Sequence, residues 1–106
     1  MLLVVFRSRL HPEHATEYAI VAARINALAA SMPGFLGIKS FAATDGERVS
    51  ISSFADEASL KHWREHPEHL AAQKLGREKF YSEYSVQVCR IEREYAKALD
   101  SPDAVV

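Results

Sequence analysis

Apolar residues follow two spacings along this chain, and each change of spacing predicts a change of element. Residues 1–10 begin as a continuous apolar run and then alternate, which is typical of a largely buried strand. Over residues 15–32, apolar side chains recur at intervals of three and four, so one face of a helix is apolar. Pro12 opens this helix, and Pro33 with Gly34 ends it.

The middle of the chain predicts a β-hairpin. Residues 35–44 and 48–54 are rich in aromatic and β-branched side chains, which favour strands. Asp45 and Gly46 lie between them, and this pair is a strong hairpin signal because tight hairpin turns need a positive φ.

The second half of the chain predicts two helices and a last strand. Asp56 is expected to cap the first helix, and Pro67 forces a break before a further helix over residues 67–81. Residues 84–92 alternate between polar and apolar, as a strand does. The order is β-α-β-β-α-β, which predicts an α+β, ferredoxin-like fold with a four-stranded antiparallel sheet. The tetrapeptide His-Pro-Glu-His opens a helix in each half, at 11–14 and 66–69, and supports an internal two-fold relation.

Length and composition predict one domain. The 106 residues match a common domain size. We expect one domain over residues 1–92 and a C-terminal tail over 93–106 that is partly ordered and frays after Pro102.

Charge and composition exclude several classes of function. A net charge of −1 and a pI near 6.5 give no electrostatic case for nucleic-acid binding. No apolar run approaches the ~20 residues that a membrane span needs, and no signal peptide is recognised. Cys89 is the single cysteine, which fits a reducing compartment. We therefore expect a cytoplasmic protein.

One face of the predicted sheet has no helix to cover it. Either register leaves apolar side chains on both faces, so we expect two sheets to pack face to face in a homodimer. Arg7 and Arg9 share one face of the first strand. At least one of them must find an acid, a ligand or water there, because an unpaired buried charge is costly. Arg7 is therefore a candidate anchor for an anionic or quinone-like oxygen.

The segment from Asp56 to Tyr84 holds the candidate site. Side chains at helical spacing form a line beside apolar neighbours, and Trp63 lies over its end; the members of the line are His66, His69, Gln73, Arg77 and Tyr81. Aromatic, imidazole and guanidinium groups in such a line predict a pocket for a flat aromatic ligand.

Other interpretations of these residues stay open. The line can be a solvated helix face on which His66 serves as a cap, and Trp63 can be a core anchor. Imidazoles of His62, His66 and His69 could reach one zinc ion, but Pro67 biases His66 away from helical torsions.

The sequence resembles the antibiotic biosynthesis monooxygenase (ABM) superfamily over residues 1–92. The resemblance rests on Met32-Pro33-Gly34-Phe35, on Trp63 and on the run from His66 to Tyr84. It implies a dimeric α+β barrel of two ferredoxin-like sheets, with a pocket between sheet and helices in each subunit. Some members of the family oxidise quinols or anthrones with molecular oxygen and neither metal nor flavin.

The resemblance also raises a haem alternative. A haem-degrading branch uses an Asn on the first strand, a Trp on the later helix and a His further along that helix. Here Trp63 matches the Trp, but Arg7 stands in place of the Asn and Gln73 in place of the His. This mismatch disfavours haem.

The leading hypothesis is a small cofactor-independent monooxygenase or quinol oxidase. His66 or His69 would take a phenolic proton, and Arg77 or Arg7 would stabilise the oxyanion. Trp63, Gln73 and Tyr81 would bind the aromatic substrate. A non-catalytic dimeric ligand-binding or regulatory module is the alternative, and a haem-binding or haem-degrading protein is the third.

Overall fold

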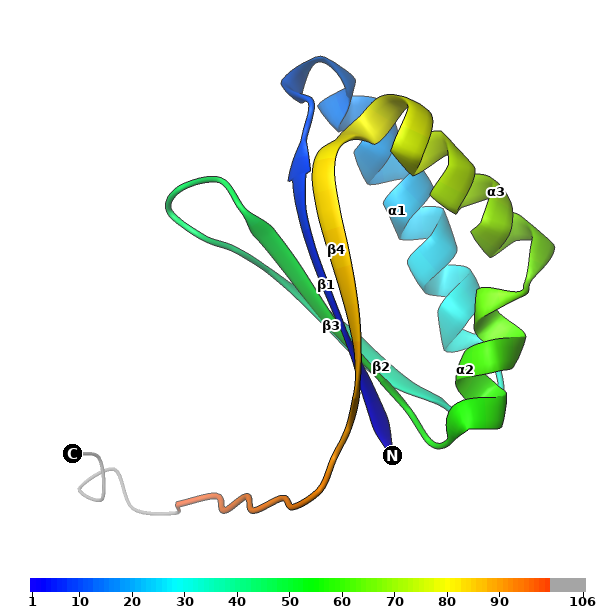
Figure 1. Ribbon diagram of the computed structural model, residues 1–106, viewed down its shortest axis with the longest axis vertical. Helices are drawn as coiled ribbons and strands as arrows, with labels where there is room; N and C mark the ends of the chain where they lie inside the picture. The colour runs from blue at the N-terminus through cyan, green and yellow to red at the C-terminus, as the bar shows by residue number, and fades with distance from the viewer. Residues whose placement is uncertain (100–106) are drawn as a thin grey trace.

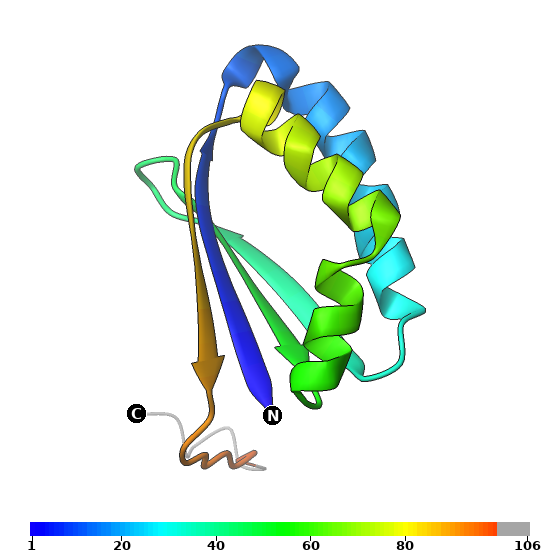
Figure 2. The same ribbon diagram turned by 45° about the vertical axis from the view of Figure 1, so that its right-hand side comes forward.

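Four antiparallel strands form one sheet, and helices cover only one of its faces. The computed structural model describes residues 1–99. The strands are β1 (Leu2–Leu10), β2 (Phe35–Ala42), β3 (Arg48–Phe54) and β4 (Tyr81–Arg90). The helices are α1 (Ala15–Ala30), α2 (Glu57–Arg64) and α3 (Pro67–Leu75), with a 3₁₀ turn, η1 (Pro12–His14), and a π-helical turn, η2 (Gly76–Phe80). Figures 1 and 2 show the helices on one side of the sheet and the opposite face bare.

The sheet order is β2-β3-β1-β4, so β2 and β4 are the edge strands. This order and the antiparallel pairing confirm the predicted α+β, ferredoxin-like fold. On β1, Val4 lies opposite Ser52 of β3 and Val88 of β4, and these three side chains point toward the helices. Because side chains alternate along a strand, Leu3 and Val5 point to the bare face.

The hydrophobic core lies at one end of the space between sheet and helices. The buried cluster consists of Leu2, Ala29, Phe54, Leu60 and Trp63. Phe54 is 2% exposed, and its ring packs edge-on against that of Phe35 at a centroid distance of 5.6 Å. The core therefore joins α1 and α2 to the start of β1 and the end of β3.

Local signals in the sequence hold these elements in place. The Asp56 carboxylate accepts a hydrogen bond from the Ser59 backbone N–H at 2.8 Å, which confirms the predicted cap of α2. Gly34 has φ +82°, and a Cβ there would lie 1.9 Å from Ser59 Oγ. The turn between α1 and β2 therefore needs glycine both for its torsion and for its space. Gly46, with φ +92°, makes the predicted hairpin turn between β2 and β3.

The last strand begins earlier than the alternation predicted. β4 starts at Tyr81 rather than at residue 84, and the α-helical part of the preceding segment ends at Leu75. The π-helical turn accounts for both differences, because it widens the helix by a residue and brings Tyr81 beside Leu10 of β1. A register shift between Arg9 and Leu10 accommodates this pairing.

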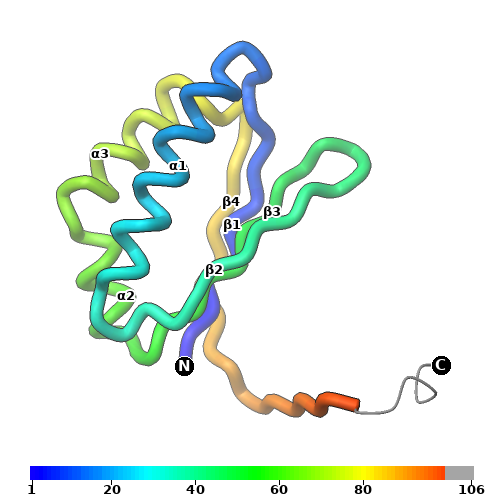
Figure 3. The backbone as a smooth tube through the Cα atoms, turned by 180° about the vertical axis from the view of Figure 1, so that it is seen from behind, coloured from blue at the N-terminus to red at the C-terminus, as the bar shows by residue number. Residues whose placement is uncertain are grey.

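After β4 the chain leaves the sheet, as Figures 1 and 3 show. Residues 91–99 contain neither helix nor strand, and the Ile91 N–H donates to the Met1 carbonyl. The predicted partial order of the tail over 93–106 concerns in part residues 100–106, which lie outside the described residues. Within the described chain, no helix is long and apolar enough to cross a bilayer.

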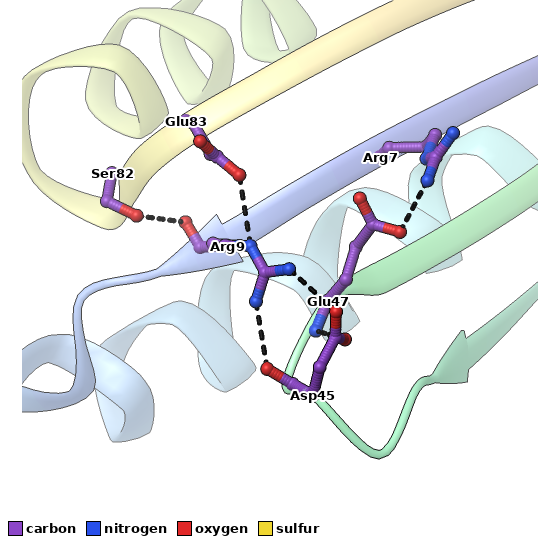
Figure 4. A network of polar contacts seen from close by, with 6 residues as sticks. All are labelled: Arg7, Arg9, Asp45, Glu47, Ser82 and Glu83. Atoms are coloured by element: carbon purple, nitrogen blue, oxygen red, sulfur yellow. Dashed lines mark hydrogen bonds and ion pairs between the residues drawn. The ribbon is translucent and has the colours of Figure 1, made fainter.

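Charged side chains occupy one end of the bare face (Figure 4). Arg7 pairs with Glu47 at 2.7 Å, and Arg9 bridges Asp45 at 2.9 Å and Glu83 at 3.0 Å. Both arginines therefore find the acid partners that their position required. These contacts also hold the β2–β3 hairpin against β1 and β4.

Candidate functional site

A cavity of about 470 Å³ lies between the covered face of the sheet and the helices. This volume falls in the range of about 300–1,000 Å³ that is common for small-molecule sites. Most lining side chains are apolar, and many carry rings; the ring-bearing residues include Phe6, Tyr18, Phe35, Trp63 and Tyr81. The cavity therefore suits a flat apolar ligand.

The predicted line of polar side chains runs along α3 into η2 and faces this cavity. His69, Gln73 and Arg77 all line it, and so does Tyr81, where β4 begins. Trp63 adds its ring from the end of α2. Every member of the predicted line except His66 thus lines the same cavity.

Two predicted site residues lie elsewhere. His66 is the N-cap of α3, where its Nδ1 accepts a hydrogen bond from the Glu68 backbone N–H at 3.2 Å, and it is absent from the cavity lining. Arg7 lies on the opposite face of the sheet in its ion pair with Glu47. Strand alternation explains this position, because Val4 and Phe6 are the cavity-facing residues of β1.

His69 has the most unusual environment in the cavity wall. Its imidazole stacks on the Trp63 indole at a centroid distance of 4.4 Å and an angle of 16°. Its Nδ1 is buried and has no hydrogen-bond partner among the described residues. Burial lowers the pKa of His69, and the nearby His66 adds to this, while the Trp63 backbone acts in the opposite direction. The ring is therefore neutral near pH 7 and able to accept a proton.

Tyr81 is held within a group of aromatic rings. Its ring centroid lies 5.3 Å from that of Phe6, 5.9 Å from that of Tyr18 and 5.8 Å from that of Tyr84. Burial raises the pKa of the Tyr81 phenol, and the neighbouring Tyr18 acts in the same direction. The phenol thus remains protonated at neutral pH and can donate a hydrogen bond, but it is unsuited to act as a base.

Several cavity residues were not predicted as site residues. On the sheet, Ser50 and Ser52 line the cavity, and Ser50 Oγ lies 2.7 Å from Ser40 Oγ. Asn26 of α1 and Arg64 of α2 add further polar groups. The strand alternation held a signal for the serines, because Ser50 and Ser52 share a face with the buried Phe54. No comparable signal marked Asn26 or Arg64.

Metal ligands do not gather in the described part of the chain. Within residues 1–99, no group of three or more His, Cys, Asp or Glu side chains could hold a metal ion. His62, His66 and His69 therefore do not form the zinc site that was an alternative for them.

The comparisons with known proteins identify the family. The family model described as antibiotic biosynthesis monooxygenase matches residues 1–75, so this chain belongs to the ABM family. It is 38% identical over 91 residues to the uncharacterized protein YqjZ of Bacillus subtilis (strain 168), a match that covers 86% of this chain and 79% of YqjZ.

Solved structures share the fold at low sequence identity. SnoaB, a cofactor-independent oxygenase from Streptomyces nogalater, has a TM-score of 0.76 at 20% identity over 91% of this chain and 97% of SnoaB. Rv0793 from Mycobacterium tuberculosis has a TM-score of 0.79 at 17% identity over 90% of this chain and 98% of Rv0793. At these identities the likeness concerns the fold, and the chemistry has to be argued from the cavity itself.

Proposed function

We propose that this protein is a cofactor-independent monooxygenase or quinol oxidase that acts on an electron-rich aromatic substrate of the quinol or anthrone type. The observation that carries the proposal is the His69 imidazole, stacked on Trp63 in the wall of a cavity lined by aromatic rings. The rings accept a flat substrate, and the imidazole accepts its proton. The description of SnoaB as a cofactor-independent oxygenase is consistent with such chemistry on this fold.

The proposed reaction begins with proton transfer from the substrate to His69. The resulting anion is electron-rich enough to reduce molecular oxygen itself. For an anthrone, the reactive methylene carbon gains one oxygen atom as a carbonyl, and the second oxygen atom leaves as water with the two methylene hydrogens. For a quinol, two electrons and two protons pass to oxygen and give a quinone and hydrogen peroxide. The protein supplies the base, the orientation and a site shielded from water.

Polar side chains on α3 and η2 stabilise the substrate anion in this proposal. Gln73 lies one helical turn from His69, so its amide can donate to an oxyanion beside the imidazole. Arg77 lies further along the chain from His69, in the π-helical turn η2. It therefore acts on charge delocalised to the far end of the ring system. Trp63 and Tyr81 provide the walls against which the substrate ring packs.

His66 and Arg7 have other roles in this account. His66 caps α3 and thereby positions the helix that carries His69. Arg7 lies across the sheet from the cavity, so it is removed from the set that stabilises the oxyanion.

Haem does not fit the residues that are present. The resemblance places Arg7 and Gln73 at the two positions that a haem-degrading member needs, and Arg7 points away from the cavity. We therefore derive no step through haem, and a Soret band on haem titration would contradict this conclusion.

The bare sheet face is part of the same proposal. Phe41 is 50% exposed and Ile51 is 37% exposed on this face, beside Leu3 and Val5. Large apolar groups on one sheet face favour burial against an identical face. We propose a homodimer through this face, with one cavity in each subunit.

Oxygen uptake with a His69 variant tests the catalytic proposal. Chelator-treated wild-type protein should oxidise an anthrone faster than its spontaneous oxidation, and His69→Gln should lower kcat by about 10²-fold or more because the base is lost. His62→Gln is the matched control, since His62 is exposed on α2 outside the cavity. An active His69→Gln variant would remove His69 as the base. Ligand binding without oxygen uptake would favour the alternative of a non-catalytic binding module.

A further inference from the structure

The charged side chains of the cavity all carry the same sign. Arg64 and Arg77 line it, and no Asp or Glu within the described residues does so. The whole sequence has 13 Lys and Arg against 14 Asp and Glu, so this imbalance does not reflect the overall composition. A cavity whose charged side chains are all cationic favours an anionic ligand.

Neither cavity arginine has an ion-pair partner within residues 1–99. The cations that do form ion pairs in this part of the chain lie outside the cavity; they are Arg7, Arg9, Arg24, Lys79 and Arg90. The guanidinium donors of Arg64 and Arg77 are therefore available to a ligand oxygen.

The two arginines stand at the opening of the cavity. Both are exposed, as are the cavity-lining Val86 and Val88 at 52% and 53%. The valines belong to the edge strand β4, and the arginines lie before and after α3. The opening thus runs between β4 and α3. Its β4 side is apolar, and its α3 side carries one arginine at each end.

We infer that the substrate is an aromatic acid and that Arg64 is a specificity-determining residue that binds its carboxylate at the opening. This inference rests on the proposed function, because it takes the same cavity as the substrate site. The rings enter the apolar interior, and the carboxylate stays at the rim, where it keeps part of its hydration. Arg64 and Trp63 both line the cavity from the end of α2, so the guanidinium that binds the acid and the indole that packs against the ring belong to one site.

Binding can be measured without catalysis, because Trp63 is the only tryptophan and lines the cavity. The probes are an anthraquinone that carries one carboxylate and its counterpart with a neutral hydroxymethyl group at the same position. Both are already oxidised and cannot be substrates of the proposed reaction. Quenching of Trp63 fluorescence, checked by calorimetry, gives a Kd for each probe.

The expected result is a preference for the acid. The carboxylate should bind about two- to fivefold more tightly than the neutral probe, which is the size of one exposed ion pair. Arg64→Gln should remove most of this preference and leave the neutral Kd within about twofold. Lys74→Gln is the matched control, because it removes one positive charge from α3 outside the cavity. Raising the salt concentration should weaken the binding of the acid probe only.

Other results would overturn the inference. It fails if the two probes bind equally, if the preference survives in Arg64→Gln, if Lys74→Gln weakens the acid as much as Arg64→Gln does, or if neither probe binds. If the protein takes up oxygen but binds the two probes without preferring the acid, the proposed function stands and this specificity is rejected. If the preference for the acid depends on Arg64 but the protein takes up no oxygen, the anion site stands and the proposed function is rejected.

Discussion

Gly76 sets the position of a cavity wall, and replacing it with alanine should show this. A Cβ at Gly76 would lie 2.6 Å from Tyr81 Cε2 and 3.0 Å from Cδ2. Non-bonded carbon atoms prefer about 3.5–4.0 Å, so the Tyr81 ring would have to move by about 1 Å. Phe6, Tyr18 and Tyr84 surround that ring and oppose the movement.

Two effects of opposite sign determine the size of the change. Overpacking of a buried ring costs about 1–3 kcal/mol. Alanine gains about 1 kcal/mol over glycine in a helical position, and the φ of −59° at Gly76 permits alanine. We expect Gly76→Ala to lower the free energy of unfolding by about 1 kcal/mol. In a Tyr81→Leu background the clash is relieved, and Gly76→Ala should raise the free energy of unfolding by up to about 1 kcal/mol.

Urea unfolding followed by Trp63 fluorescence measures all four proteins of this cycle. The coupling between positions 76 and 81 should be about 2 kcal/mol, the difference between the two expected effects. A coupling below about 0.5 kcal/mol would refute the reasoning, since independent sites show no more than that. It would mean that Tyr81 is not held where the structure places it.

Three further predictions concern stability and assembly. Burial lowers the pKa of folded His69, so the unfolded chain binds a proton more readily; the free energy of unfolding should fall as pH drops below about 6.5 and level off below the folded pKa. Urea titrations at several pH values should show this slope reduced in His69→Asn, and an unchanged slope would contradict it. Asp56→Ala should cost about 1 kcal/mol in the same assay, because the cap of α2 is lost, and an unchanged midpoint would contradict that role. Ile51→Glu should give monomers by sedimentation, because it places a charge in the proposed sheet interface, and a persisting dimer would argue against that interface.

The fold was predictable because its local signals agree. Pro33 with Gly34 ends the first helix, Asp45 with Gly46 makes the hairpin, and Asp56 caps α2. Each of these acts within a few residues, so sequence alone reveals it. The π-helical turn was missed, because Tyr81, which follows it, pairs with Leu10 across the sheet, and no local pattern reveals that pairing.

The candidate site was predictable where it follows one helix. Helical spacing was enough to place His69, Gln73 and Arg77 in one line. The direction of Arg7 was not predictable, because either register left apolar groups on both faces of the sheet. Arg64 and Ser52 were missed because they reach the cavity from other elements, whose arrangement only the tertiary structure reveals.

Oxygen uptake by metal-free wild-type protein tests the central claim most directly. The substrates are hydroquinones, naphthoquinols and anthrones, each compared with its own spontaneous oxidation. The account predicts protein-dependent uptake that saturates with at least one of these classes, because turnover needs the substrate to be bound in the cavity. Uptake no faster than the spontaneous rate across the whole panel would contradict the claim that this protein is a monooxygenase or quinol oxidase.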